Sequence, residues 1–356
     1  MHCDSRRRVL SLSFMLSHHL DHGSRAAAAQ ALLKRVARRI SQVYVMIKHA
    51  LLAAFAATTT TALDRCTVIG GSGFIGKAVC KMLAAKGVAV TSVSRSGRPA
   101  DREPWMDKVD WVAADAAKDS LSAALDGAGA CISCVGGFTG AKASPTGTGD
   151  IPVLFASYSP QDQAEYRQKN GPPNEAIAKA AKEAGVGRYV LVGVAADAEN
   201  GLAGGIPGYF EGKADALDAA VRNFGAEAVV VCPHEVVEPG SARIKAVDNP
   251  FARFARDANK AIGSVGYRGE DLVMKLSLTP PSSVDDVATV VAAAAASDLD
   301  VDVSTRKTRR VLLDTSDGIR TLDESREYNV DARFVDGSDA IKETAAGKVA
   351  LWNTSV

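Results

Sequence analysis

Tyr209 and Lys213 form the most specific pair of chemically active residues in the sequence. They stand in a Tyr-x-x-x-Lys arrangement, a spacing that puts both side chains on one face of a helix. A free tyrosine has a pKa of about 10, so proton transfer near neutrality needs help from its surroundings. A lysine ammonium nearby would favour the phenolate and could also hold a nicotinamide ribose. The pair therefore predicts a tyrosine that donates or orients a proton in an oxidoreductase site.

A glycine-rich turn early in the body of the chain predicts a dinucleotide site. The run Cys66–Ile69 has the character of a short buried strand, and helical periodicity begins at Phe74. Glycines between them permit a tight turn and let backbone N–H groups reach a pyrophosphate at the helix N-terminus. They fit two spacings, G-x-G-x-x-G from residue 71 and G-x-x-G-x-x-G from residue 70. The same pattern also occurs in ordinary turns, but a second strand over 88–94 completes a unit of the expected size. The predicted contacts are Gly70, Gly71, Ser72, Gly73, Phe74, Ile75 and Gly76.

The residues after the second strand indicate which nicotinamide cofactor binds. An acid about twenty residues beyond the turn is typical of sites that prefer NAD, where it binds the ribose 2′-hydroxyl. Here residues 94–98 read Ser-Arg-Ser-Gly-Arg, without an acid. A guanidinium at Arg95 would match a 2′-phosphate through bidentate, charge-assisted hydrogen bonds. We therefore expect NADP(H) in preference to NAD(H); the alternative is an arginine on a solvated loop.

Further positions at strand ends complete the predicted nucleotide site. Asp115 follows the third strand, where an acid would bind the adenine amino group; the alternative is an ordinary helix cap. Val135 and Gly136 end the fourth strand, and a glycine there lets the backbone pass close to the cofactor ribose. Pro233 ends the sixth strand near the expected nicotinamide. His234 follows it and would either donate a hydrogen bond or proton to a substrate or pack beside the proline turn.

Strands and helices alternate from residue 64 onward, which predicts a doubly wound parallel sheet of the α/β class. The expected domain spans 64–300 with a small C-terminal substrate lobe from about 235, and 301–356 is expected to be a partly ordered extension. Residues 136–160 predict a long loop over the cofactor edge, and a polar tail is expected after about 325. The expected strands are 66–70, 88–94, 109–114, 130–135, 188–194, 227–232 and 310–314; the expected helices are 74–86, 119–126, 172–185, 208–223 and 284–296.

Composition is that of a soluble globular protein, with 47% apolar and 23% charged residues in a chain of 356. Residues 1–63 carry nine basic and two acidic residues, a charge of +7 that leaves −6 for the rest of the +1 total. A mildly acidic body argues against nucleic acid as the main partner. We expect no metal site. Cys131 and Cys134 form a Cys-x-x-Cys in a predicted strand without a second ligand pair, which favours core thiols in a reducing compartment.

The basic segment 1–63 predicts a targeting leader that is not part of the fold. One interpretation is a mitochondrial presequence, with basic residues over 25–39 on an amphipathic helix. The other begins at Met46, where a short apolar run over 50–57 resembles a signal peptide. Its Ala-Phe-Ala at 54–56 is similar to the plastid-import signature of algae with complex plastids. We favour a plastid, with the mitochondrion as the alternative; a disordered tail without an address is the third interpretation.

These motifs together resemble the atypical short-chain dehydrogenase/reductase (SDR) proteins over roughly 65–300. The resemblance is greatest to the branch with the NADPH-binding accessory subunit of respiratory complex I, a plant plastoglobule flavin-reductase-like protein and a fungal mitochondrial protein of ubiquinone synthesis. It implies NADP(H) binding in an organelle and, in some members, an assembly or structural role without catalysis. The chain departs from these relatives at Pro233-His234, where they tend to have Pro-Gly. Besides the glycine turn, the resemblance rests on 92–99, Trp105, 109–111, 114–115, 135–138, 170–171, 208–213 and 284–288.

One catalytic residue that this resemblance implies is missing. SDR enzymes usually place a Ser or Thr at the end of the fifth strand to bind the substrate carbonyl. Here that strand ends in Val-Gly-Val-Ala-Ala over 192–196, and no Ser or Thr occurs between Ser159 and Ser241. The usual group of three catalytic residues therefore cannot form from this segment.

Two functions of different class follow from these observations. The first is an NADPH-dependent oxidoreductase that acts on a quinone-, flavin- or isoprenoid-like acceptor, with Tyr209 and Lys213 as catalytic residues. The second is a non-catalytic NADPH-binding accessory or assembly subunit of a respiratory or quinone-synthesis complex. A nucleotide-sugar epimerase is a third interpretation, weakened by the missing hydroxyl. Peripheral attachment to a membrane or a larger complex stays open, as does the oligomeric state.

Overall fold

The computed structural model describes residues 63–137, 160–202, 206–242, 244–245, 250, 254–255, 279–297, 299–311 and 325–353. These residues fall within one compact unit, Ala62–Val356. The predicted leader, most of the predicted loop over 136–160 and most of the segment from 243 to 278 lie outside the described residues. No helix in the described part of the chain is long and apolar enough to cross a bilayer.

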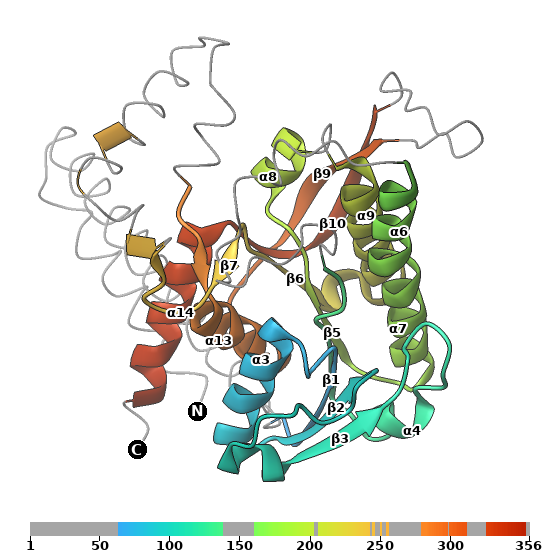
Figure 1. Ribbon diagram of the computed structural model, residues 1–356, viewed down its shortest axis with the longest axis vertical. Helices are drawn as coiled ribbons and strands as arrows, with labels where there is room; N and C mark the ends of the chain where they lie inside the picture. The colour runs from blue at the N-terminus through green and yellow to red at the C-terminus, as the bar shows by residue number, and fades with distance from the viewer. Residues whose placement is uncertain are drawn as a thin grey trace, which may run out of the picture. The chain divides into compact units, whose positions relative to one another are not determined.

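An open sheet of eight strands, in the order β3-β2-β1-β4-β5-β6-β10-β9, forms the centre of the described fold (Figure 1). All neighbouring strands pair in parallel except β9, which runs antiparallel to β10 at the edge. The central strands are runs of apolar residues because helices cover both of their faces. The strands are β1 Arg65–Ile69, β2 Ala89–Ser94, β3 Val109–Ala113, β4 Ala130–Ser133, β5 Arg188–Val192, β6 Ala228–Cys232, β9 Val303–Val311 and β10 Ser325–Asp336; β7 Val236–Val237 pairs separately with β8 Ser282–Ser283.

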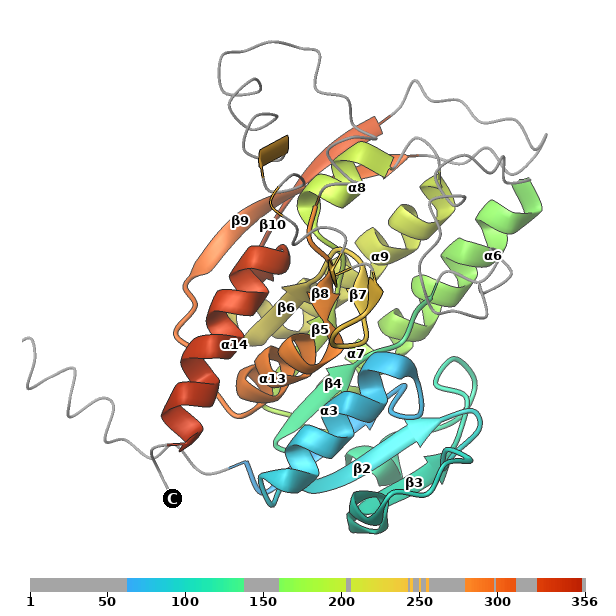
Figure 2. The ribbon, with the colours of Figure 1, turned by 60° about the vertical axis from the view of Figure 1, so that its left-hand side comes forward.

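Helices cover the two faces of the sheet as separate layers, which confirms the predicted doubly wound α/β fold. On one face α3, α13 and α14 lie side by side (Figure 2), and their apolar residues pack on Val68 and Ile132. On the other face α7 and α9 pack on Ile69 and Leu191. The helices are α3 Phe74–Ala85, α4 Ser122–Leu125, α6 Pro160–Asn170, α7 Pro172–Glu183, α8 Ala196–Leu202, α9 Pro207–Phe224, α13 Val284–Ala295 and α14 Ser338–Asn353, with short 3₁₀ turns η1 Pro104–Lys108 and η2 Gly225–Glu227.

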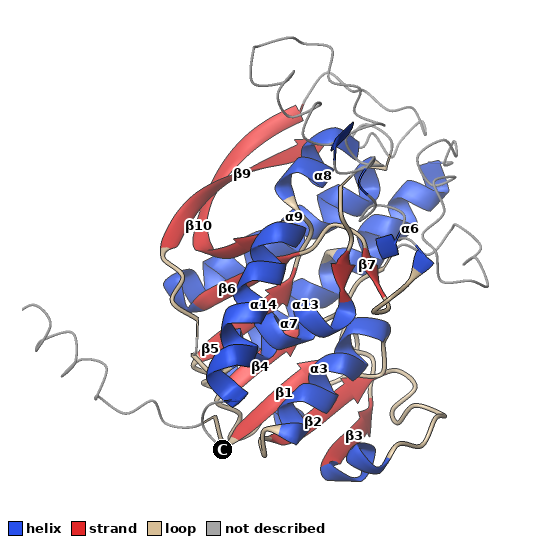
Figure 3. Ribbon diagram, turned by 90° about the vertical axis from the view of Figure 1, so that its left-hand side faces the viewer, coloured by secondary structure: helices blue, strands red, loops and turns tan. Residues whose placement is uncertain are grey.

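The predicted polar tail after residue 325 is wrong. Strand β10 extends the parallel sheet beside β6, with Phe334 opposite Val230, and α14 then packs on α13. Figure 3 shows β9 and β10 as a long antiparallel pair along one edge of the sheet. The predicted strand over 310–314 overlaps only the end of β9, which begins at Val303. The buried Val330 and Ala332 stand in a strand whose other residues are mostly charged or polar, which conceals the alternation that would have revealed β10.

Candidate functional site

The glycine turn between β1 and α3 packs too tightly for any side chain at Gly76. A Cβ on this residue would lie 2.2 Å from the Gly70 carbonyl oxygen and 2.7 Å from the Gly71 Cα. The turn is closed by two backbone bonds, from the Gly70 N–H to the Val93 carbonyl at 2.7 Å and from the Gly73 N–H to the Gly70 carbonyl at 3.0 Å. Gly70 itself has a φ of +86°, which glycine adopts without strain. The predicted turn is therefore formed by backbone in direct contact with backbone.

The start of α3 offers the features of an anion site. No side chain caps this helix, and its first turn carries no acid. Gly73 and Phe74 are exposed at the start of the helix, with Phe74 47% exposed. Helix N-termini of this kind bind phosphate through their N–H groups and the helix dipole. Ser72 and Ile75, which flank these two residues, are half-buried. The predicted glycine-turn residues thus fit the pyrophosphate of a dinucleotide.

Arg95 is an exposed cation just after β2, at the carboxyl edge of the sheet where the glycine turn also lies. The nearby Arg98 is paired with Asp107 at 2.6 Å. Arg95 makes no ion pair or hydrogen bond among the described residues. The hydroxyls of Ser72 and Ser96 lie 3.1 Å apart and join the glycine turn to this loop. Arg95 directly precedes Ser96 in the chain, and an exposed guanidinium in this loop fits a bound phosphate.

Asp115 acts in a local turn after β3. Its Oδ1 accepts the Ala117 N–H at 3.1 Å, and its own N–H donates to Asp119 Oδ2 at 2.7 Å. Lys118 lies 3.6 Å from its other oxygen. These contacts place Asp115 in a turn before α4, whose N-cap is Leu121, and a contact with adenine stays a prediction.

Two buried asparagines hold the loop after β4 that contains Val135 and Gly136. The side-chain amide of Asn170 donates to the Gly137 carbonyl and its Oδ1 accepts the Gly137 N–H, both at 3.2 Å. Asn174 donates to the Val135 carbonyl at 3.2 Å and accepts the Ser133 hydroxyl. Neither asparagine was among the predicted site residues. Their four-residue spacing just after a Gly- and Pro-rich loop was the available signal.

Lys213 lies buried at the carboxyl ends of β4 and β5. Its Nζ donates to the Val192 carbonyl at 3.2 Å. A Cβ on Gly136 would lie 2.9 Å from this Nζ and 2.5 Å from Asn170 Oδ1, so three segments meet at one point. Burial lowers the pKa of Lys213 to about 8. The predicted lysine is thus at the expected cofactor edge.

The expected effect of Lys213 on Tyr209 is not what the structure shows. Burial raises the pKa of Tyr209 to about 12, so the phenol is favoured over the phenolate. Lys213 Nζ lies 5.9 Å from the centroid of the tyrosine ring, on the shared helix face that the spacing predicted. Loss of hydration is the cause of this shift, and burial also lowers the pKa of Lys213, which reduces the charge that could favour a phenolate. Tyr209 therefore presents a protonated hydroxyl at neutral pH.

Tight contact between α6 and α9 sets the position of Tyr209. The Gly208 N–H donates to Gln163 Oε1 at 2.9 Å at the start of α9. A Cβ on Gly208 would lie 1.9 Å from the Gln163 carbonyl oxygen, and one on Gly212 would lie 2.8 Å from Asn170 Cβ. Glycines on both sides of Tyr209 thus let the two helices touch along one face.

The shifted pKa of Lys213 predicts a pH-dependent stability term. The unfolded lysine has a pKa of about 10.4, so between about pH 8 and 10 the unfolded state binds more protons than the folded state. The stability that the neutral Lys213 contributes is complete above the unfolded pKa and is lost as pH falls through about 8. The free energy of unfolding of wild type should therefore rise by about 2 kcal/mol between pH 7 and 10, relative to that of Lys213→Met, which has no titrating group at this position. Urea unfolding of both proteins at each pH measures this difference, and parallel curves would contradict it.

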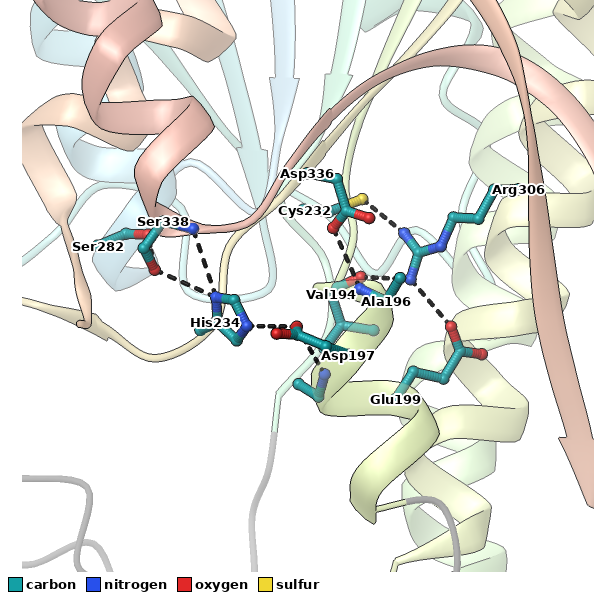
Figure 4. Close-up of polar contacts among 11 residues, drawn as sticks. Val194, Ala196, Asp197, Glu199, Cys232, His234, Ser282, Arg306, Asp336 and Ser338 are labelled. Atoms are coloured by element: carbon teal, nitrogen blue, oxygen red, sulfur yellow. Dashed lines mark hydrogen bonds and ion pairs between the residues drawn. The ribbon is translucent and has the colours of Figure 1, made fainter. Parts of the chain in front are cut away.

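The end of β5 has no hydroxyl, as the sequence indicated, and α8 begins there. The Ala195 N–H donates to the Pro233 carbonyl at 3.0 Å, which joins the ends of β5 and β6. The ring of His234 contacts Asp197 through Nε2 and Ser338 through Nδ1 (Figure 4). These contacts match the packing alternative for His234; a direct role in catalysis stays a prediction.

The cysteines of the described residues are free thiols, and all of them except Cys134 are buried. Burial raises the pKa of Cys131 to about 12, and that of Cys134 also lies above its usual range because of burial. In the described part of the chain, no three His, Cys, Asp or Glu residues are grouped to hold a metal ion.

Comparison with known proteins identifies the family. Residues 70–260 match the model of the NAD(P)H-binding family. The chain belongs to this NAD(P)H-binding family. The matched range starts at the first glycine of the turn and contains β2 to β6, whose ends form the site described above. This match confirms the predicted dinucleotide-binding domain and is consistent with the resemblance to atypical SDR proteins.

Individual relatives resemble only part of this chain, with identities between 22% and 42%. An uncharacterized chloroplastic protein of Arabidopsis thaliana is 30% identical over 234 residues, 64% of this chain and 70% of the relative. MIOREX complex component 2 of Saccharomyces cerevisiae is 42% identical over 72 residues, 18% of this chain and 26% of that protein. A solved oxidoreductase of the SDR family from Burkholderia thailandensis is 22% identical, with a TM-score of 0.42 over 66% of this chain and 86% of that structure.

Proposed function

We propose that the protein is an NADP(H)-dependent oxidoreductase of an organelle, acting on a quinone-, flavin- or isoprenoid-like acceptor. The observation that carries the proposal is Arg95, an exposed cation without a partner among the described residues, which precedes Ser96 in the loop that the Ser72–Ser96 contact joins to the glycine turn. A solvated arginine in a loop with carboxylates would be expected to pair, as Arg98 does with Asp107.

The residues of the site have distinct tasks in this function. Backbone N–H groups at the start of α3 bind the pyrophosphate, and Arg95 binds the 2′-phosphate. Lys213 hydrogen-bonds the nicotinamide ribose. Tyr209, a neutral phenol because of burial, orients the acceptor or donates a proton to it. The bound cofactor supplies the hydride.

Reversing the charge at Arg95 tests the cofactor preference. We expect Arg95→Asp to weaken NADPH binding at least about 30-fold, since a charge-assisted bidentate contact is replaced by repulsion, and to leave NADH within about threefold. Isothermal titration calorimetry with each nucleotide measures both affinities. Arg98→Asp is the matched control, because Arg98 already pairs with Asp107. Equal losses of NADPH and NADH affinity in Arg95→Asp would show that Arg95 does not bind the 2′-phosphate.

Removing the hydroxyl of Tyr209 tests whether the protein is an enzyme. We expect Tyr209→Phe to bind NADPH as wild type does but to lose about 100-fold or more in acceptor-dependent NADPH oxidation, the usual contribution of a positioned proton donor. Stopped-flow absorbance with quinone and flavin acceptors follows the reaction. Unchanged turnover in the variant would rule out a catalytic role for this hydroxyl.

A non-catalytic accessory subunit is the second candidate. It is favoured by the absence of a hydroxyl at the end of β5 and by the two contacts that engage both ring nitrogens of His234. In that case NADPH would stabilise the fold as a permanent ligand. Tight NADPH binding without oxidation by any acceptor supports this role.

We propose a plastid as the location, with the mitochondrion as the alternative. The proposal is supported by the basic segment 1–63 and by the chloroplastic relative. Sequencing the mature N-terminus from isolated organelles distinguishes the two, and also decides between Met1 and Met46 as the start.

A further inference from the structure

A carboxylate stands where the site lacks a hydroxyl. Asp197, in the first turn of α8, is the first residue after β5 with a polar side chain, and that side chain is 43% exposed. It lies beyond the carboxyl end of the strand, the side of a parallel sheet on which ligands bind. The Val192 carbonyl, which accepts from Lys213, is at the end of the same strand. Asp197 therefore lies at the same carboxyl edge of the sheet as the strand end that Lys213 contacts.

A chain of hydrogen bonds through His234 positions the Asp197 carboxylate (Figure 4). His234 Nε2 contacts Asp197 Oδ1, and the Ala198 N–H donates to the same oxygen at 2.9 Å. On the other side of the ring, the Ser338 N–H donates to His234 Nδ1 at 3.3 Å. This donor assigns Nδ1 as an acceptor, so Nε2 carries the proton and donates to Asp197.

The chain continues into the protein. The Ser282 hydroxyl donates to the Ser338 hydroxyl at 3.0 Å, and Ser338 Oγ lies 3.2 Å from His234 Nδ1. Both serines are buried. These contacts thus link Ser282, Ser338 and His234 to Asp197 in one continuous chain. Such a chain orients the carboxylate.

The turn that carries Asp197 is fixed by the C-terminal strands. The Ala196 N–H donates to Asp336 Oδ1 at 3.1 Å. Arg306 donates to the Val194 carbonyl at 2.8 Å and to Glu199 Oε2 at 2.9 Å, with both of these charged side chains buried. A functional group held this way keeps its position without a ligand, which is what precise recognition requires.

We propose that Asp197 determines acceptor specificity by accepting a hydrogen bond from a ring N–H or hydroxyl of the redox substrate. This inference rests on the proposed oxidoreductase function and narrows its substrate class. A carboxylate offers about four acceptor positions, and the Asp197 side chain is 43% exposed, so a ligand can reach it to donate a hydrogen bond. Acceptors that carry only carbonyl oxygens gain nothing from it. His234 is then a positioning residue.

Two flavin rings that differ by one methyl group test the proposal. Lumiflavin has an imide N–H, which its N3-methyl analogue lacks. We expect wild type to favour lumiflavin about tenfold or more in kcat/KM, the range for a hydrogen bond to a charged group. Asp197→Asn keeps an oxygen for His234 but presents a donor to the ligand. It should remove the preference, mainly through KM, and leave reduction of the N3-methyl analogue and of menadione within about twofold of wild type.

Binding and stability measurements separate the possible results. Quenching of flavin fluorescence gives the two dissociation constants without turnover, so the preference can be measured even if no acceptor is reduced and the proposed function fails. His234→Gln, which retains a donor, should keep most of the preference, and His234→Ala should lose it. A wild type that binds both flavins equally would overturn the proposal. So would an Asp197→Asn variant that weakens all three acceptors alike with a lower Tm, since that result means a structural role only.

Discussion

Gly76→Ala is expected to abolish saturable NADPH binding. The new Cβ would meet the Gly70 carbonyl oxygen at 2.2 Å and the Gly71 Cα at 2.7 Å, and neither group is the flexible end of a side chain. The turn must open to relieve the contact, which moves the N–H groups that would face the pyrophosphate. We also expect a loss of about 3 kcal/mol in the free energy of unfolding, the upper range for an overpacked site. Calorimetric titration with NADPH and urea unfolding measure the two effects.

Gly347→Ala is the matched control for this substitution. Gly347 lies on α14, and a Cβ there would meet no atom within 4 Å. An alanine in a helix should stabilise the protein by about 0.5–1 kcal/mol, because it restricts the unfolded chain. NADPH binding should be unchanged. If Gly76→Ala bound NADPH as tightly as this control does, the glycine turn would not be the pyrophosphate site.

Arg306→Met, a substitution in β9, is expected to cause a large loss in the free energy of unfolding. The side chains of Arg306 and Glu199 are 7% and 4% exposed, so the loss of Arg306 removes the buried cation that Glu199 contacts. Breaking such a pair typically costs about 3–5 kcal/mol. Arg306 also donates to Cys232 Sγ at 2.9 Å and to the Val194 carbonyl, and these bonds are lost with it. Urea unfolding followed by circular dichroism gives the difference.

The double variant Arg306→Met/Glu199→Gln shows whether the buried charge causes this loss. Removing both charges should recover much of the stability, because an uncharged pair needs no compensation. Lys179→Met, in an exposed pair with Glu183, should change stability by less than about 1 kcal/mol. No recovery in the double variant would mean that the lost hydrogen bonds to Val194 and Cys232, and not the charge on Glu199, account for the effect.

Helix α6 and strand β10 show where sequence patterns stop being informative. The sequence of α6, Pro160–Asn170, is almost entirely polar, so it has no apolar periodicity. It is helical because Gln163 and Asn170 face the glycines of α9 and because Tyr166 is buried. Strand β10 lies beside β6, with Arg333 opposite Val229, although about a hundred residues separate them in the chain. In both cases a distant partner, not local propensity, determines the structure.

The pKa values at the site show the same limit. Residue spacing placed Tyr209 and Lys213 on one helix face, which the structure bears out. The sequence could not indicate how deeply the two side chains are buried, so it gave the wrong direction for the tyrosine. Burial raises the pKa of Tyr209 and lowers that of Lys213, each toward its neutral form.

By itself, the sequence determined the alternation of strands and helices, the glycine turn after β1, and Arg95 in place of an acid. These features depend on residues within one or two turns of each other, where periodicity and glycine geometry act directly. The tertiary structure alone decided that Asp197, His234 and Ser338 form a chain of contacts and that Arg306 and Asp336 hold the turn before α8. Those contacts join strand ends and helices that are far apart in sequence, and they come together only when the whole sheet has assembled.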